Sequence, residues 1–289
     1  MLGNKKLEEL KKQSVPMQTK VEAICKGTDA IQRFAEKHVI PILQGLVSRS
    51  DYEEALISVY YRMYTWLLSL VKLRNPIHIQ AASAAARWTF ELLLDLKALY
   101  NDPKLEAKYH AFTFVERFHA AKTLINFIDS TSGATGSYKM ERDFINDASN
   151  IGKFNSLLTT HWPARPGKKQ GTPSHWTGKD VAGRARDAGP KYEERYRIIY
   201  ARLSWFVHPG LAGLGGLSSA GVEAGFAWAH GLIQEFFYEA SEIVGNGLHL
   251  FDSAPDLRQR LQKARSVPGE EIILALLAAE DARGSGATG

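Results

Sequence analysis

The chain has one cysteine, Cys25, among its 289 residues. A single thiol excludes an internal disulfide framework and any zinc site built from cysteines. We expect Cys25 to be a small buried apolar side chain. The histidines are scattered, and the closest approach to a ligand set is the pair Glu116 and His119. We find no phosphate-cradling glycine loop and no G-x-S-x-G turn. The sequence therefore predicts neither a metal site nor a cofactor.

Long apolar runs are also missing. The longest candidate, Val59 to Val71, contains Arg62 and is shorter than the ~20 apolar residues that a membrane crossing needs. The first 13 residues are charged and lack the apolar core of a signal peptide. We therefore expect a cytoplasmic protein without a membrane partner.

Charge of either sign is moderate. The net charge is +5 and the isoelectric point is near 9.1, which favours an anionic partner such as nucleic acid. Hydrophobic residues make up 45% of the chain and charged residues 23%, as in ordinary soluble globular proteins. The apolar positions repeat every 3.6 residues throughout, so we predict an all-α fold with few or no strands.

Several helices are marked by their ends. Ser50-x-x-Glu53 is a capping box that opens a helix to about Arg74, and Asn75-Pro76 starts another that runs to Tyr100. The lead-in 1–27 is helical, with breaks at Pro16 and Gly27. Further helices are expected at 28–47 with a kink at Pro41, 104–129, 138–158, 179–188 with Thr177 as its cap, and 222–246, then two that start at Pro255 and Pro268.

The segment from Tyr192 to Gly210 is predicted to be the central helix. Gly189-Pro190 opens it and Pro209-Gly210 closes it. Its apolar stripe comprises Tyr192, Tyr196, Ile199, Leu203 and Phe206. Arg202 and His208 lie near its end, where the polar tips of side chains can reach solvent. Arginine is a permanent cation, and histidine titrates near neutral pH.

The spacing of Arg202 and His208 is a weak signal by itself, because roughly one or two R-x(4–6)-H matches are expected by chance. The other match, Arg33 and His38, lies in a polar stretch and is interpreted as part of a solvated face. Six positions on a straight helix separate two side chains by about 120°. Arg202 and His208 can meet only if His208 lies past the last turn or a dimer supplies both groups. Alternatively, both residues are structural.

An early helix carries polar residues on an otherwise apolar face. Ser83, Arg87, Glu91 and Asp95 step by four, so they lie along one side and are expected to be partly buried with partners. Arg87 and Glu91 either hold Arg202 and His208 in position without touching the substrate themselves or form an internal salt bridge between two helices.

A long irregular stretch, 161–178, contains three prolines and two tryptophans and is expected to dock on the bundle. The region 163–187 is basic, with aromatic rings between the charges, a pattern typical of single-strand RNA binding. The candidate RNA-binding residues are Lys168, Lys169, His175, Trp176, Lys179 and Arg184. The alternative is a solvated loop whose tryptophans pack on the bundle.

These motifs together resemble the HEPN superfamily and are similar to a bacterial family of unassigned function within or beside it. The resemblance spans residues 50–250. Its motifs are Arg87-x3-Glu91, His175-Trp176-Thr177-Gly178 and Tyr200-x-x-Leu203-Ser204-x-x-Val207-His208. It implies an N-terminal helical extension (1–49), a HEPN-like helical core (50–250), and C-terminal helices with a disordered tail (251–289).

The resemblance also implies a function. Many HEPN proteins are metal-independent endoribonucleases of toxin–antitoxin, abortive-infection and CRISPR systems that act as dimers. By this likeness His208 is the general acid and base, Arg202 holds the scissile phosphate, and Ser204 lies on the same face as His208. Leu203 departs from the family, since many active members have a small polar residue there. The rival interpretation is a non-catalytic helical module that binds a partner protein, such as an antitoxin, or a nucleotide or RNA.

Overall fold

The structure is a computed structural model that describes residues 17–46, 49–131, 138–164, 166–207 and 219–265. Within these ranges it contains no β-strand, which confirms the prediction of an all-α helical bundle. Its elements are α2 (Met17–Phe34), η1 (Ala35–Val39), α3 (Ile40–Gly45), α4 (Asp51–Leu70), η2 (Pro76–His78), α5 (Ile79–Asn101), η3 (Pro103–Leu105), α6 (Glu106–Thr131), α7 (Lys139–Asn146), α8 (Ala148–His161), α9 (Val181–Ala188), α10 (Pro190–Arg195), η4 (Tyr196–Tyr200), α11 (Ala201–Val207), α13 (Ser219–Gly247), α14 (Leu250–Ser253) and α15 (Asp256–Arg265). The predictions for Pro16, His208, Pro209, Gly210 and Pro268 fall outside the described residues.

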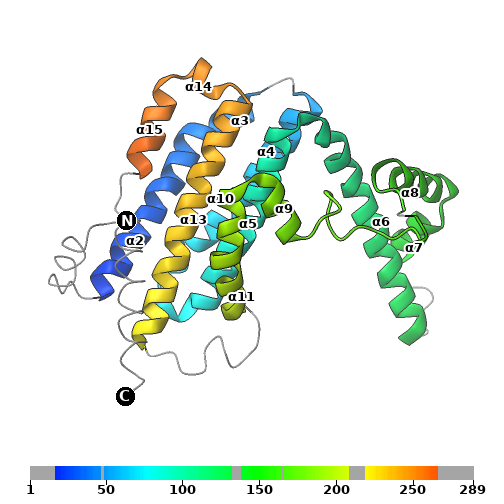
Figure 1. Ribbon diagram of the computed structural model, residues 1–289, viewed down its shortest axis with the longest axis horizontal. Helices are drawn as coiled ribbons and strands as arrows, with labels where there is room; N and C mark the ends of the chain where they lie inside the picture. Colours follow the sequence, from blue (N-terminus) through cyan, green and yellow to red (C-terminus); the bar gives the residue numbers. More distant parts are fainter. Residues whose placement is uncertain (1–16, 47–48, 132–137, 165, 208–218, 266–289) are drawn as a thin grey trace.

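The central helix of the bundle is α13, which packs against α2, α4 and α5 (Figure 1). Its Phe226, Phe236 and Phe237 are fully buried. Burial of each such side chain contributes roughly 1.5–3 kcal/mol relative to leaving it exposed. The helix over 192–207, which we expected at the centre, instead packs on the outer side of α5. The longer and more apolar element therefore takes the middle position.

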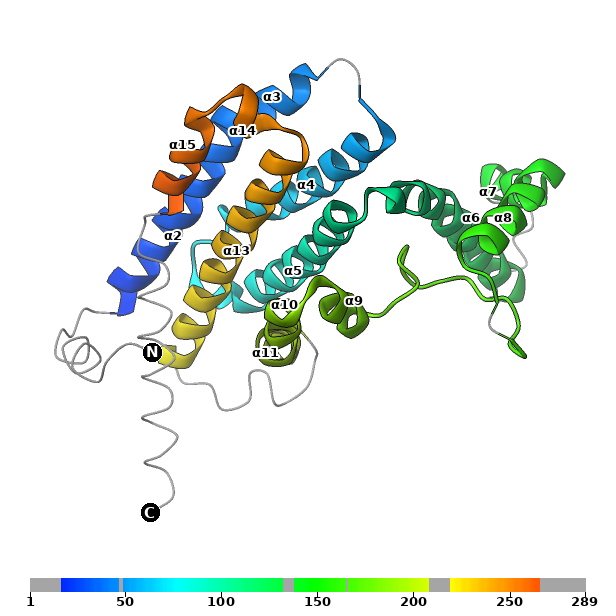
Figure 2. The same cartoon turned by 45° about the horizontal axis from the view of Figure 1, so that its top comes forward.

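One hydrophobic core runs from Val21 in α2 to Leu261 in α15. The segments 1–49 and 251–289 were expected as extensions of a core over 50–250, and their described parts, 17–46 and 251–265, contribute helices to that same core. In both views α2 and α15 lie side by side at one edge of the bundle (Figures 1 and 2).

Cys25 lies in this core, as predicted, and burial raises the pKa of its thiol. The break expected at Gly27 is wrong, because α2 continues through it. A Cβ at Gly27 would lie 2.5 Å from Gln234 Oε1 on α13. Glycine at this position leaves room for the Gln234 carboxamide, which donates to the Ile24 carbonyl at 2.8 Å, and it marks no turn.

The predicted starts of α4 and α5 are confirmed. The Glu53 amide donates to Ser50 Oγ at 3.3 Å, and the Ser50 amide donates to Glu53 Oε2 at 2.7 Å, which completes the capping box. The Asn75 carboxamide oxygen accepts from the Ile77 amide at 3.0 Å. Near Pro41 the chain does deviate from a regular helix, by a π-helical turn, η1, in which the Ile40 amide donates to the Ala35 carbonyl.

Two expected helix boundaries are wrong. Asp147 Oδ1 accepts from the Asn150 amide at 2.9 Å and starts α8, so the helix expected over 138–158 is two helices. The cap of α9 is Asp180, which accepts from the Gly183 amide at 2.7 Å. Thr177, expected as that cap, instead accepts from the Lys179 amide one turn earlier. Asp is as good an N-cap as Thr, so composition alone could not choose between them.

Helices α6, α7 and α8 form an arm that projects from the bundle (Figures 1 and 2). The arm has a small core of its own around Ala111, Val115, Leu158 and Trp162. The irregular segment 162–180 then returns to the bundle and leads into α9, α10, η4 and α11 along α5. No stretch of helix in the described part of the chain has the length and hydropathy that a membrane crossing requires.

Candidate functional site

Arg202, predicted to hold the phosphate, lies on α11 and is partly buried. Its guanidinium carbon is 5.4 Å from the centre of the Trp228 ring on α13, a cation–π contact. The Ser204 hydroxyl donates to the Tyr200 carbonyl at 2.8 Å, a local bond one turn back along the helix. His208 is outside the described residues. The structure therefore places two of the three predicted catalytic residues.

Tyr200 is held by the two residues predicted to support the catalytic pair. Arg87 Nε donates to the Tyr200 hydroxyl at 2.9 Å, and this hydroxyl donates to Glu91 Oε1 at 2.9 Å. The Arg87 guanidinium carbon also lies 4.8 Å from the centre of the Tyr200 ring. Burial, together with the charge of Glu91, raises the pKa of Tyr200 to about 12. The hydroxyl therefore keeps its proton at neutral pH and remains a donor.

Arg184 joins the other side of the same carboxylate to α9. Its guanidinium donates to Glu91 Oε2 at 3.0 Å and to Asp95 Oδ1 at 2.9 Å. The same group donates to the Glu91 backbone carbonyl at 3.2 Å. Only 4% of the Arg184 side chain and 5% of the Asp95 side chain are exposed. Such a buried pair is tolerated because each charge has several partners.

His175 completes the chain of contacts from the returning segment. Its Nε2 lies 3.2 Å from Asp95 Oδ1. The Thr177 amide donates to His175 Nδ1 at 3.2 Å, on the opposite side of the ring from Asp95. The imidazole is thus held in one orientation between a backbone donor and a carboxylate.

These contacts form one buried cluster, which we call the Glu91 cluster; its members are Arg87, Glu91, Asp95, His175, Arg184 and Tyr200. It unites α5, α9, η4 and the returning segment, and it contains two arginines and two carboxylates. The spacing by four on α5 correctly predicted partly buried charges with partners. Three motif segments far apart in the sequence meet here, as expected if they serve one site.

Arg184 was the unexpected member of the cluster. We predicted it as an RNA-binding residue, but its guanidinium is buried against Glu91 and Asp95 and does not face solvent. The sequence offers one signal in retrospect: Asp180 caps α9, which fixes residue 184 one turn into the helix. That signal identifies the face of Arg184 but not its partners on α5.

Trp176 is buried as well. It is 3% exposed and packs edge-on against Tyr109 with ring centres 5.5 Å apart. Its carbonyl accepts from Trp162 Nε1 at 2.9 Å. The ring in this position is closed to a stacking base, so the alternative interpretation, tryptophans packed on the bundle, describes it. Lys168 and Lys169 are exposed, and their predicted role remains a prediction.

A pocket of about 420 Å³ opens beside the Glu91 cluster. Its wall combines Glu91, Asp95, His175 and Arg184 with the rings of Trp88, Tyr109, Phe112 and Trp176. Trp88 is 47% exposed, so one flat apolar face is accessible at its edge. Arg184 Nε and Trp176 Nε1 are buried donors without an acceptor among the described residues.

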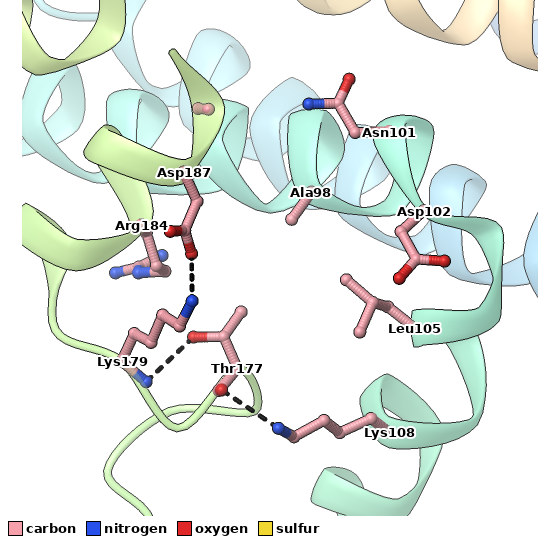
Figure 3. Close-up of a pocket in the computed structure, with 10 residues that line it drawn as sticks. Ala98, Asn101, Asp102, Leu105, Lys108, Thr177, Lys179, Arg184 and Asp187 are labelled. Atoms are coloured by element: carbon pink, nitrogen blue, oxygen red, sulfur yellow. Dashed lines mark hydrogen bonds and ion pairs between the residues drawn. The ribbon is translucent and has the colours of Figure 1, made fainter. Parts of the chain in front are cut away.

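A second pocket of about 280 Å³ lies on the other side of Lys179, and Figure 3 shows its lining. Lys179 Nζ pairs with Asp187 Oδ2 at 2.5 Å, and Lys108 Nζ donates to the Thr177 carbonyl at 3.1 Å. Burial, and then the charge of Lys179, lower the pKa of Lys108. Lys179, predicted to bind RNA, is therefore half-exposed and already paired with a carboxylate.

Sequence reasoning missed one further buried ion cluster. Arg195 on α10 is 9% exposed at its side chain and pairs with Glu239 Oε2 on α13 at 2.7 Å, and also with Glu235. The Tyr192 hydroxyl donates to the same Glu239. These contacts join the helix that bears Arg202 to the centre of the bundle. The spacing of Glu235 and Glu239 by four was a signal for a shared face.

Among the described residues, no group of three or more His, Cys, Asp or Glu side chains could hold a metal ion. No curated protein and no solved structure matches the chain. Residues 53–221 match the profile of a family of unknown function, DUF5677. This range includes the whole Glu91 cluster, together with Arg202 and His208. Because the match covers more than half of the sequence, the chain belongs to the family of unknown function DUF5677.

Proposed function

We propose that the chain is a metal-independent endoribonuclease of a toxin or phage-defence system, acting in the cytoplasm as a homodimer. In this proposal Arg202 binds the scissile phosphate, His208 transfers protons, and Ser204 assists from the same face. The proposal carries forward the resemblance to HEPN domains. The observation that supports it best is an exposed apolar stripe on the helix that carries Arg202.

Ile198, Ala201 and Trp205 form this stripe: all three are exposed, Ala201 and Trp205 are four positions apart on α11, and Ile198 lies in the π-helical turn before them. Ile198 is 62% exposed and Trp205 60% exposed. Clustered exposed apolar groups are typical of protein interfaces. A second copy bound to this face with two-fold symmetry would bring both Arg202 side chains to one interface.

The Glu91 cluster supports a positioning role for Arg87 and Glu91. Both side chains bind Tyr200, which lies two residues before Arg202 in the same continuous helix. Their contacts therefore fix the height and rotation of the turn that presents Arg202. The alternative considered from the sequence, an internal salt bridge between two helices, is present as well, between Glu91 on α5 and Arg184 on α9.

The proposed reaction uses the RNA's own 2′-hydroxyl. His208 accepts the 2′-hydroxyl proton, the 2′-oxygen forms a bond to phosphorus, and the bond to the 5′-oxygen breaks. An imidazolium then protonates that leaving oxygen, and such proton transfer contributes typically about 10²–10⁴-fold to the rate. Arg202 stabilises the charge on the phosphoryl oxygens by paired hydrogen bonds. The products are a 2′,3′-cyclic phosphate and a 5′-hydroxyl end.

The test is cleavage of total RNA by purified protein in the presence of EDTA, with the ends of the products mapped. His208→Ala and Arg202→Ala should each abolish cleavage and relieve any growth arrest on expression. The matched control is Arg197→Ala, an arginine on the same helix that is 72% exposed at its side chain and pairs with Glu193. It should cleave as wild type does. Wild type and His208→Ala with equal RNA products would refute the ribonuclease.

One observation favours the rival function, a non-catalytic module that binds a nucleotide, RNA or partner protein. The lining of the pocket of about 420 Å³ includes the half-exposed ring of Trp88 together with His175 and Lys179. An accessible aromatic ring beside a few polar side chains is typical of sites that bind small molecules such as nucleotides. Under this alternative, a nucleotide raises the melting temperature of wild type and His208→Ala equally, and neither cleaves RNA.

A further inference from the structure

A groove of about 500 Å³ runs between α2 with η1 on one side and α15 on the other. These elements lie side by side at the edge of the bundle opposite the projecting arm (Figures 1 and 2). Phe34, a buried residue, and Ala30 contribute the apolar part of the lining. Leu257 and Leu261, on the opposite face of α15, are buried in the core. The face of α15 that lines the groove is therefore left open to solvent.

The rest of this lining is strongly basic. Arg33 and Lys37 line it from the α2 side, and Arg260 and Lys263 from α15. These four permanent cations face one carboxylate, Asp256, which is already bound to Arg260 at 2.8 Å. Cations on both walls of a concave surface attract a polyanion and release its counterions on binding.

The π-helical turn η1 explains why Arg33 and His38 line the same groove. On a regular α-helix, residues five positions apart point about 140° away from each other. A π-helical turn acts as a one-residue insertion, so positions five apart across it are offset by only about 40°, as positions four apart are on a regular helix. Arg33 is exposed and His38 is partly exposed, which agrees with the sequence interpretation of a solvated face, and both side chains line this groove.

His38 is suited to bind an anion as a neutral donor. Its ring lies 5.8 Å from that of Phe34, at the apolar side of the groove. Burial, followed by the nearby charge of Arg260 and with Lys37 acting in the same direction, lowers the pKa of His38; Asp256 opposes them. A neutral imidazole can donate one hydrogen bond to a phosphate oxygen and accept one from a sugar hydroxyl.

We propose that this groove binds the phosphodiester backbone of single-stranded nucleic acid. Arginines on both walls offer forked donors that match phosphate oxygens, and lysines add point charges. The groove is concave and has cations on both walls, a shape that follows a strand of phosphates more closely than it follows a flat membrane surface. The choice of RNA as the natural ligand rests on the proposed function, whereas the groove itself is inferred from its own residues.

The experiment measures binding separately from cleavage. A fluorescent 2′-O-methyl RNA 20-mer, which lacks the nucleophilic hydroxyl, is titrated with full-length protein across a range of salt concentrations. The double variant Arg33→Gln/Lys263→Gln should weaken binding at least tenfold. The slope of log affinity against log salt should fall by about 1.4, since each phosphate contact on a single strand contributes about 0.7. A DNA 20-mer of the same sequence should compete, because the ligand is the backbone.

The matched control is Lys122→Gln/Lys139→Gln, which removes two exposed lysines from the arm and leaves the groove intact. Its affinity should stay within twofold of wild type. Equal affinity in both double variants, or no RNA binding by wild type, overturns the proposal. If the wild type binds RNA through the groove but does not cleave RNA, the proposed ribonuclease activity is refuted and the proposed binding by the groove is supported.

Discussion

The hydroxyl of Tyr200 donates a hydrogen bond of 2.9 Å to Glu91 Oε1, which joins η4 to α5 across 109 positions of sequence. Tyr200→Phe removes this donor and also the acceptor of Arg87 Nε. Two partly buried charged groups then lose a partner, so we expect the free energy of unfolding to fall by about 1–3 kcal/mol. Urea denaturation at pH 7 measures the change.

The control for this substitution is Tyr196→Phe. The Tyr196 ring stacks on Tyr200 with centres 5.2 Å apart, but its hydroxyl has no hydrogen bond with the residues that the structure describes. Its removal should change stability by about 0.5 kcal/mol or less. Equal losses in the two variants would show that ring packing, rather than the Glu91 bond, holds this segment.

Arg184 and Lys179 provide a comparison between a buried and an exposed ion pair. Arg184→Met leaves Glu91 and Asp95 without their shared cation and should destabilise the fold by about 3–5 kcal/mol. Lys179→Met breaks the pair with Asp187, whose side chain is 54% exposed, and should cost about 1 kcal/mol or less. Thermal or urea unfolding of both variants tests the contrast. A loss below about 1 kcal/mol for Arg184→Met would contradict a structural role for the Glu91 cluster.

His230 should make stability depend on pH in the acidic range. Its Nδ1 lies 3.0 Å from Thr28 Oγ1, and burial lowers the pKa of His230 to about 4. Between pH 6.5 and 4 the unfolded state therefore binds a proton that the folded state does not. The contribution of His230 to the free energy of unfolding is fully present above about pH 6.5. It falls as the pH decreases, by about 2 kcal/mol between pH 7 and 5. Urea midpoints at the two pH values measure this loss.

His230→Asn is the matched variant, because an amide keeps hydrogen-bonding capacity but does not titrate. It should be less stable at pH 7 and should lose less stability on acidification than wild type. An unchanged pH dependence in the variant would assign the acid sensitivity to other groups.

Two helical glycines should respond to alanine in opposite directions. A Cβ at Gly245 in α13 would lie 2.3 Å from the Phe251 ring, so Gly245→Ala should destabilise by about 1–3 kcal/mol through overpacking. Gly152 in α8 has nothing within 4 Å of its Cβ position. Gly152→Ala should stabilise by about 0.5–1 kcal/mol, the usual gain in helix propensity. Melting temperatures that move in the same direction would contradict the packing of α14 on α13.

The sequence predicted those parts of the fold that depend on local chemistry. The capping box at Ser50 and the start at Asn75 were correct because caps are read from residues a few positions apart. Gly27 was misread as a break, since its purpose is contact with Gln234, about two hundred positions away. The choice of α13 over residues 192–207 as the centre also depends on long-range packing.

For the candidate site as well, the sequence predicted the local features and not the long-range contacts. Spacing by four on α5 predicted that Arg87, Glu91 and Asp95 share a face and need partners. It could not predict that Arg184 would be the partner, because the sequence offers many arginines and places none of them in space. A basic residue in a basic segment looks like a ligand for RNA, whereas this one balances two carboxylates inside the protein.

The π-helical turn at Ala35–Val39 behaves as a one-residue insertion within an otherwise continuous helix from Met17 to Gly45. Deleting one residue here, such as Lys37, would restore the α-helical ladder and rotate α2 by about 100° relative to α3. Either α2 or α3 would then turn buried side chains, such as Ile31 on α2 or Leu43 on α3, away from the core. The number of residues across this turn, more than their identity, therefore sets which sides of α2 and α3 face the core.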